Sequence, residues 1–385
     1  MDSSEVVSDS PARILRHAGG RQARSPTASV QCRWYATADQ VPGWPSAPTP
    51  YATREWARAW QQVRTEPVRD ARCARVTTGV QTCVATYYLV THSPAWAAFE
   101  AEAGVGDAWQ GQPVVYGPSP YATYGGVGAA MPATLRAVTA AGLAFAAETG
   151  ACAFVAPGLR EDQAQRWAAA TPGAVLVRTT SAHQAPVRGS LEAFQKAISY
   201  SQGARQEFGR QLRRGEDAGL RLDIVPGAQI TPDLPVFTTL ASAAAGRHGT
   251  SLYGPDILSA AASAPGSVLL AARHGSHLAG AFLCLRHAST LHLWAAGLDY
   301  DALPRLHTYG WLMASAVRYA AQTGATAIDF GRGNYRYKRR LGGRTVRLFA
   351  LCWMTRDDPR LAVALTDMGR RITAATATWD TGSMQ

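Results

Sequence analysis

The sequence predicts an α/β protein with mixed sheets, divided into two halves of similar plan. Segments rich in β-branched and aromatic residues alternate with helical stretches, and the order of these segments in the first half returns approximately in the second half. A length of 385 residues also suits two domains of the usual size. We therefore expect a duplicated domain, with boundaries at 31–189 and 190–358 and a C-terminal helix and tail over 359–385.

The first half begins with a segment that lacks hydrophobic periodicity. Residues 1–30 are rich in Ser, Ala, Arg and Gly, so we expect a disordered tail there. A proline-dense loop and a glycine turn at 124–128 separate the predicted elements, and the helix over 133–148 ends near a glycine. The helices of this half are expected at 52–62, 133–148 and 161–170, and the strands at 81–91, 113–116, 151–156 and 174–179.

The second half repeats this plan. Ser190 caps the first of two helical pieces within 190–218, and the second of these pieces is basic. Two strands joined by a short turn at 288–289 are typical of a hairpin. The other helices are expected at 236–246, 255–264 and 303–322, and the strands at 221–225, 267–274, 278–286, 290–298 and 325–330.

Composition favours a globular protein of the cytoplasm. The chain is 47% hydrophobic and 17% charged, which is enough apolar material for two cores. We expect neither a signal peptide nor a membrane span, because the N-terminus is acidic and no apolar run reaches about 18 residues. The six cysteines are widely scattered, so we expect reduced thiols and no metal site.

The positive charge lies in the second half of the chain. The formal net charge is +11; residues 34–189 carry 11 basic and 10 acidic residues, whereas residues 190–354 carry 18 and 10, an excess of 18 − 10 = +8. A one-sided basic field favours a polyanionic partner such as RNA, or a phosphate-bearing substrate or cofactor. Charge that serves only solubility remains an alternative.

The segment 325–347 holds the most informative residues. It consists of a short apolar strand, a glycine-bracketed turn, a basic cluster and the start of another strand, with seven Lys or Arg between Arg332 and Arg347 and no acid. Lys338 is one of only two lysines in the chain, the other being Lys196. Arginine replaces lysine as a solvated charge, but not as a compact ammonium whose pKa can shift. Lys338 is thus the first candidate for chemistry, unless it is an accidental survivor of codon bias on a solvated face.

Two motifs in this sequence resemble a known family. The strand end D-F-G-x-G followed by Y-K-x-x-x-G is similar to the second domain of the two-domain acyltransferases of the GNAT superfamily, the Fem-type peptidoglycan bridge aminoacyltransferases and the related acetyltransferase 6 proteins. The turn at 120–127 resembles one in their first domain, and the basic helix over 204–219 resembles theirs after the domain crossover. The matching positions are Asp329, Phe330, Gly331, Gly333, Tyr337, Lys338 and Gly342, with Leu341 where the family often has phenylalanine. The resemblance implies two tandem GNAT-like domains with a cleft between them and an acyl-transfer site in the second domain.

The choice of acyl donor rests on a departure from the superfamily pattern. The usual coenzyme A loop is R/Q-x-x-G-x-G/A, whereas residues 299–304 after the strand 290–298 contain no glycine. A pyrophosphate would lack its cradle of backbone N–H groups. This departure weighs against acyl-coenzyme A. The resemblance to Fem-type enzymes, which transfer an aminoacyl group from aminoacyl-tRNA to an amine, then implies aminoacyl-tRNA as co-substrate and an acceptor amine on a small-molecule natural product or a peptidoglycan precursor. An acyl-coenzyme A dependent N-acyltransferase and a non-catalytic RNA-binding module remain alternatives.

The resemblance and the chemistry of aminolysis together suggest residue roles. Lys338 is expected beside the developing oxyanion or the terminal phosphate of the tRNA. Asp329 would orient an arginine or bind the amine, unless it forms only a structural salt bridge, and Tyr337 would stack on the terminal adenine or pack in the core. Phosphate contacts are expected from Arg332, Arg336, Arg339, Arg340, Arg344, Arg210 and Arg214, although the last two also suit a solvated ion-pair face. The substrate cleft is expected at Tyr124, Gly125, Gly126, His307 and Tyr309, although a simple β-turn explains 124–126 equally well.

Overall fold

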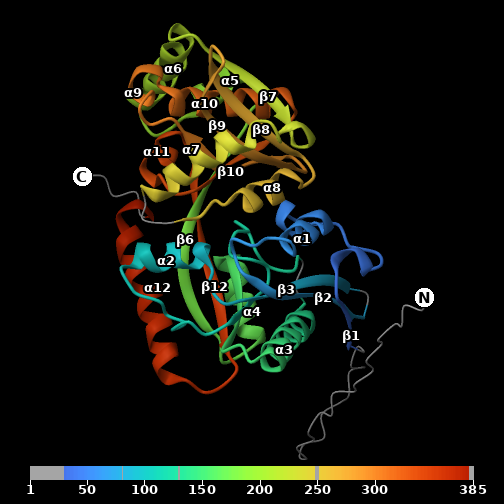
Figure 1. Ribbon diagram of the computed structural model, residues 1–385. Helices are drawn as coiled ribbons and strands as arrows, with labels where there is room; N and C mark the ends of the chain where they lie inside the picture. Colours follow the sequence, from blue (N-terminus) through green and yellow to red (C-terminus); the bar gives the residue numbers. More distant parts are fainter. Residues whose placement is uncertain (1–29, 80, 129–130, 248–250, 381–385) are drawn as a thin grey trace, which may run out of the picture.

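The computed structural model describes residues 30–79, 81–128, 131–247 and 251–380 (Figure 1). Within these residues, the strands form one mixed sheet in the order β1-β2-β3-β4-β5-β12-β6-β11-β10-β9-β8-β7. The predicted class, α/β with mixed sheets, is confirmed. The predicted tail at 1–30 lies outside the described residues except for Val30, which begins β1.

The sheet consists of two similar series of strands. Each series has antiparallel neighbours and ends in one parallel pair, β4 with β5 and β10 with β11. The first series is β1 (Val30–Tyr35), β2 (Val68–Thr78), β3 (Gln81–Val90), β4 (Val114–Tyr116) and β5 (Ala153–Arg160). The second is β7 (Leu220–Pro226), β8 (Ser267–His274), β9 (His277–His287), β10 (Thr290–Leu298) and β11 (Ala327–Arg332). This repetition is what the order of elements predicts for a duplicated unit.

The two series exchange their last strands. β6 (Val175–Pro186) follows the first series in sequence but pairs with β11 of the second, and β12 (Arg344–Met354) follows the second series but pairs with β5 of the first. β6 and β12 also pair with each other, and they run through the middle of the molecule (Figure 1). Neither half is complete without a strand from the other. The predicted division near residue 190 falls between β6 and the next helix, and the domain boundaries themselves stay a prediction.

Helices cover both faces of the sheet. α10 packs on β8, β9 and β10 together with α5 and α6, and α7 lies against β10. In the first half α3 and α4 pack on the sheet, and α12 lies along β6 and α2. The helices are α1 (Arg54–Trp60), α2 (Pro94–Ala103), α3 (Pro132–Thr149), α4 (Glu161–Ala170), α5 (Leu191–Ala197), α6 (Gln202–Asp217), α7 (Leu234–Gly246), α8 (Pro255–Ala262), α9 (Leu303–Leu306), α10 (Thr308–Gln322), α11 (Tyr335–Arg340) and α12 (Pro359–Asp380). In the part of the chain described here, no helix combines the length and apolar character needed to cross a bilayer.

Several elements differ from the sequence-based expectation. The helix expected over 303–322 divides at His307, whose φ of 54° is left-handed and cannot continue an α-helix. The basic cluster forms the short helix α11. The strand β1, most of β2 and the helix α2 were not predicted, because exposed or mixed-polarity segments give weak periodicity.

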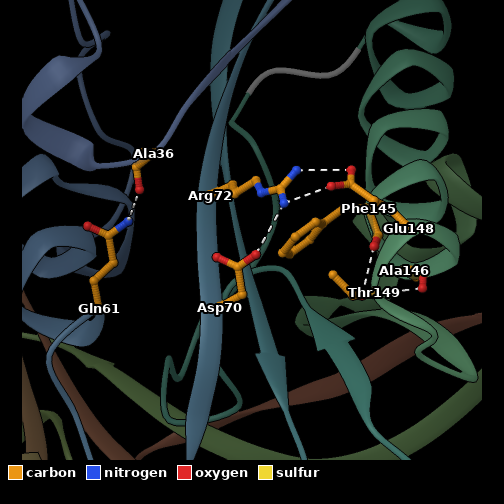
Figure 2. Close-up of polar contacts among 8 residues, drawn as sticks. All are labelled: Ala36, Gln61, Asp70, Arg72, Phe145, Ala146, Glu148 and Thr149. Carbon is orange, nitrogen blue, oxygen red and sulfur yellow. Dashed lines mark hydrogen bonds and ion pairs between the residues drawn. The ribbon is translucent and has the colours of Figure 1, made fainter. Parts of the chain in front are cut away.

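Arg72 on β2 links α3 to the sheet (Figure 2). Its guanidinium on β2 donates to both carboxylate oxygens of Glu148 at 3.0 and 2.8 Å and to Asp70 at 3.2 Å. The same group lies 4.7 Å from the ring centre of Phe145, so it also covers an apolar surface. Because Glu148 is largely exposed, solvent weakens its bidentate ion pair with Arg72. We therefore expect this ion pair to contribute more to the position of α3 than to the stability of the fold.

The turn at 124–128 approaches β5 closely. The Gly125 N–H donates to the carbonyl of Gly158 at 2.9 Å. A Cβ at Gly125 would lie 1.8 Å from the carbonyl oxygen of Pro157, a separation that no side chain tolerates. The turn that carries Tyr124 can therefore reach β5 only through a glycine.

We expect Gly125→Ala to destabilise the protein by about 1 to 3 kcal/mol, because the methyl group must displace backbone atoms of β5. Urea unfolding followed by circular dichroism measures the change. Gly246→Ala is the matched control, since an added Cβ there meets no atom within 4 Å. Equal stability of the two variants would contradict the close approach.

Candidate functional site

Three polar side chains lie in one row across three adjacent strands. β10 and β11 pair in parallel over only three positions, the last of which sets His292 beside Asp329. On its other edge β11 is antiparallel to β6, and there Asp329 pairs with Gln184. Residues in register on neighbouring strands point to the same face of a sheet, so the three side chains meet. The row combines a strand of the first half with two strands of the second.

Asp329 is the centre of this row and is 1% exposed. Its Oδ1 accepts the N–H of Gly331 at 2.7 Å, and its Oδ2 accepts the amide N–H of Gln184 at 3.1 Å. Nδ1 of His292 lies 3.5 Å from Oδ2. Burial alone would raise the pKa of Asp329, but the contacts to His292, Tyr124 and Gln184 outweigh it and hold this pKa below its usual value. Asp329 is therefore a buried, ionised carboxylate.

The backbone geometry at the end of β11 explains the glycine of the D-F-G motif, Gly331. Gly331 has a φ of +70°, and a Cβ at this position would lie 2.6 Å from the carbonyl oxygen of Leu293 on β10. A side chain would push apart β10 and β11 where they begin to diverge. The same backbone turn delivers the Gly331 N–H to Asp329.

Aromatic and basic side chains from the first half lie around the row that contains Asp329. The hydroxyl of Tyr124 accepts the Gln184 amide N–H at 3.0 Å, and the guanidinium of Arg160 lies 4.7 Å from the Tyr124 ring centre. Tyr51 donates its hydroxyl hydrogen to Thr123 at 3.1 Å, and its ring faces His292 edge-on. The aromatic wall and the row of polar side chains thus form one cluster.

Lys338 lies beside this cluster on α11. It is 5% exposed, and its Nζ donates to the carbonyl of Arg332 at 2.5 Å. Burial lowers the pKa of Lys338 to about 7, with the charge of Asp329 opposing part of the shift. Near neutral pH this amine passes readily between its charged and neutral forms.

The predicted phosphate-binding arginines fall into two groups. Arg332 is half-buried; it donates to the carbonyls of Pro120 and Tyr121 at 3.0 and 3.2 Å, and it lies over the ring of Phe99. It therefore connects the end of β11 to the first half. Arg336 and Arg344 are exposed, Arg339 and Arg340 are partly exposed, and Arg210 and Arg214 are exposed on α6, where Arg210 pairs with Glu207 at 3.3 Å.

Tyr337 and Tyr309 lie in the contact between α6, α10 and α11. The Tyr337 hydroxyl donates to Gln211 at 2.6 Å, and the centres of the two tyrosine rings are 5.2 Å apart. His307 is half-buried between α9 and α10. No contact of these three residues with Asp329 appears among the described residues. The structure therefore groups Asp329, Lys338 and Tyr124, and it places Tyr337, Tyr309 and His307 with the helices.

The predicted cleft residues near Tyr124 line a small cavity. Tyr51, Tyr124 and Gly126 border a space of about 20 Å³, which suits a single water. The structure adds residues that sequence reasoning did not single out. They are His292, Gln184, Tyr51 and Arg160. Only His292 carried a sequence signal, as an isolated histidine in the otherwise apolar strand 290–298. The cleft between the halves stays a prediction.

The chain is similar to several known proteins. Residues 202–339 match the family described as Acetyltransferase (GNAT) domain. The structure of FemX superposes with a TM-score of 0.53 at 10% identity, covering 77% of this chain and 90% of that one. A tandem GNAT protein from the clavulanic acid biosynthesis pathway gives 0.48 at 13% identity, covering 86% and 100%, and L-PGS from Bacillus licheniformis gives 0.48 at 10%, covering 74% and 86%. A search of curated proteins gave no match.

The family match and the fold agree with each other. Residues 202–339 are similar to the acetyltransferase (GNAT) domain family, and the chain as a whole has a fold like that of FemX. The resemblance of the second half to a GNAT domain, predicted from the D-F-G-x-G and Y-K motifs, is confirmed for these residues.

We expect Lys338→Met to change the pH dependence of stability. The pKa of Lys338 is about 7 in the folded protein against 10.5 for an ordinary lysine, so between these values the unfolded chain binds the extra proton. The free energy of unfolding of the wild type should therefore rise with pH through this window relative to the variant, which has no amine to protonate.

Urea unfolding at several pH values between about 6.5 and 10 measures the difference. Lys338→Met should be the more stable protein at the acid end, and its advantage should shrink as the pH rises. Lys196→Met is the control, because Lys196 is exposed on α5. A difference that stays constant across this range would show that Lys338 is not buried as described.

Proposed function

We propose that the protein is an aminoacyl-tRNA-dependent aminoacyltransferase that forms an amide on the amine of a natural product or a peptidoglycan precursor. The observation that carries the choice of donor is the turn after β10. There the carboxylate of Asp299 accepts the backbone N–H groups of Asp301 and Ala302 at 3.0 and 3.1 Å. The N–H groups that would cradle a pyrophosphate are already bound to a negative charge.

The electrostatics of this turn oppose an acyl-coenzyme A donor. The hydrogen bond from Ala302, together with those from His277 and Asp301, lowers the pKa of Asp299 against the opposing effect of burial, so its carboxylate is ionised at neutral pH. A pyrophosphate at this site would meet that charge as a like charge. The next helix, α9, has only four residues and ends at the left-handed His307. The coenzyme A loop that the sequence lacks is thus replaced by a self-capped acidic turn.

The basic face around α11 suits the phosphates of a tRNA end. Arg336 and Arg344 are exposed within eight residues of each other, and Arg339 and Arg340 add partly exposed guanidinium groups. Exposed guanidinium forks bind phosphate oxygens and need no sequence readout. This face lies next to Lys338, so a bound 3′ end would bring its ester close to the buried amine.

The transfer itself requires one bond to form and one to break. The neutral acceptor amine attacks the ester carbonyl, the N–C bond forms, and the C–O bond to the 3′-oxygen breaks. The proton that the amine loses ends on the leaving 3′-oxygen. In its charged form Lys338 stabilises the oxyanion of the tetrahedral intermediate, an effect that is large in a site shielded from water.

We expect wild-type protein to transfer radiolabel from charged tRNA to a bacterial small-molecule extract, and Lys338→Ala to lose about 10²- to 10³-fold in rate. Lys196→Ala, at the exposed second lysine, should match the wild type. An acyl-coenzyme A pool serves as the parallel donor. Label that moves only from coenzyme A would overturn the donor assignment and favour the acyl-coenzyme A dependent N-acyltransferase. RNA binding without any transfer would favour the non-catalytic module.

We also expect the double variant Arg336→Gln, Arg344→Gln to bind tRNA more weakly and with less salt dependence. Each lost phosphate contact should reduce the slope of log K against log salt by about 0.7 to 0.9. Filter binding between low and moderate salt measures this slope. Arg166→Gln is the control, because Arg166 is an exposed arginine of the first half that pairs with Asp162. An unchanged slope would place the tRNA elsewhere on the surface.

A further inference from the structure

His292 is a buried histidine whose ring lies against two tyrosine rings. It lies on β10 directly before the bulge between Leu293 and Ala295, and it is 7% exposed. Its ring centre is 6.0 Å from that of Tyr51 and 6.1 Å from that of Tyr124, both in edge-on arrangements. The two aromatic rings restrict the orientation of the imidazole, so its two nitrogens point in fixed directions.

One of these nitrogens faces the carboxylate of Asp329. Nδ1 is fully buried, lies 3.5 Å from Oδ2, and has no well-aligned hydrogen-bond partner. The ionised carboxylate is an acceptor only, so it favours the tautomer in which Nδ1 carries the hydrogen. In that tautomer Nε2 carries a lone pair. A separation of 3.5 Å is loose, as is common in catalytic pairs before substrate tightens them.

The other side of the ring is available to a ligand. Among the described residues no hydrogen bond reaches Nε2, and 9% of the side chain remains exposed although Nδ1 is buried. Asp329 cannot move toward a different partner, because Gly331 and Gln184 hold both of its oxygens. A fixed carboxylate, an oriented imidazole and an open Nε2 form the usual arrangement of a general base and its positioning group.

We propose that His292 is the general base of the acyl transfer and that Asp329 is its positioning residue. This inference rests on the proposed function. Nε2 takes the proton that the acceptor amine loses as its nitrogen bonds to the carbonyl carbon. The imidazolium then gives this proton to the 3′-oxygen as the ester C–O bond breaks, so the histidine ends neutral. Asp329 stabilises the imidazolium between these steps and keeps its own charge.

The groups around the pair determine how it responds to pH. Tyr51 and Tyr124 face the ring, Lys338 acts on Asp329 through its charge, and Arg160 lies over Tyr124. The charge of Arg332 reaches both tyrosines. Because the pKa of Lys338 is lowered to about 7, this amine also affects the rate profile near neutral pH, and a variant at His292 is needed to separate the two groups.

The first test is spectroscopic and needs no substrate. Long-range ¹H–¹⁵N correlation spectra of the full protein give the tautomer of each histidine, and His292→Gln identifies the signal. We expect His292 to have its hydrogen on Nδ1, and Asp329→Asn to change that tautomer. His277 is an internal comparison: its Nε2 faces Asp299 at 2.8 Å, so there the carboxylate favours the tautomer with the hydrogen on Nε2. Hydrogen on Nε2 of His292, or no response to Asp329→Asn, would overturn the proposal.

The second test is the pH dependence of transfer. His292→Gln should lower kcat by about 10²- to 10⁴-fold, with a smaller change in KM, and should change the acid limb of the profile. His274→Gln on β8, outside the cluster, is the control. A variant that keeps both the rate and the acid limb of the wild type would overturn the assignment. If the wild type transferred label from no donor, the proposed function would fail, whereas the spectra would still decide whether the pair exists.

Discussion

The ionised carboxylate of Asp329 is the constraint on which the centre of this protein depends. Burying a charge is costly unless hydrogen bonds and neighbouring polar groups replace its water. Here the replacements come from four places: the backbone of Gly331, Gln184 on β6, His292 on β10 and Tyr124 in a turn of the first half. Each of these elements must keep its position relative to Asp329 for the carboxylate to keep its polar contacts. The polar row therefore specifies how the two halves meet.

The exchange of strands makes that meeting obligatory. β6 belongs to the first half in sequence but completes the second half of the sheet, and β12 does the reverse. Gln184 consequently reaches Asp329 only because its strand has crossed over. A site of this kind cannot be assembled by either half alone, and its geometry is supported by continuous strands instead of a mobile linker. Rigid strands hold reacting groups with more precision than loops do.

The sequence predicted those parts of the fold and site that depend on local pattern. The strand near 325–330, the D-F-G motif and the isolated Lys338 are all visible within one short segment, and the structure brings Asp329 and Lys338 together. Gln184 and Tyr51 could not be found in this way. Their contacts depend on pairings across more than 100 residues, which leave no trace in the periodicity of their own strand or loop. Tyr337 shows the opposite case, since a motif position is occupied by a side chain that bonds to Gln211 on α6.

The burial of position 338 on α11 gives a physical reason for a lysine there in a chain that has so few lysines. Lys338 is 5% exposed, while Arg339 and Arg340 on the same helix keep part of their surface in solvent. Arginine keeps its charge at every accessible pH, so an arginine at position 338 would bury a permanent cation where the lysine has, among the described residues, one carbonyl as its hydrogen-bond partner. Lysine avoids this cost, because burial can lower its pKa until the neutral amine is populated. A chain that otherwise uses arginine for nearly all its positive charge thus has lysine at a position where the basic side chain is buried.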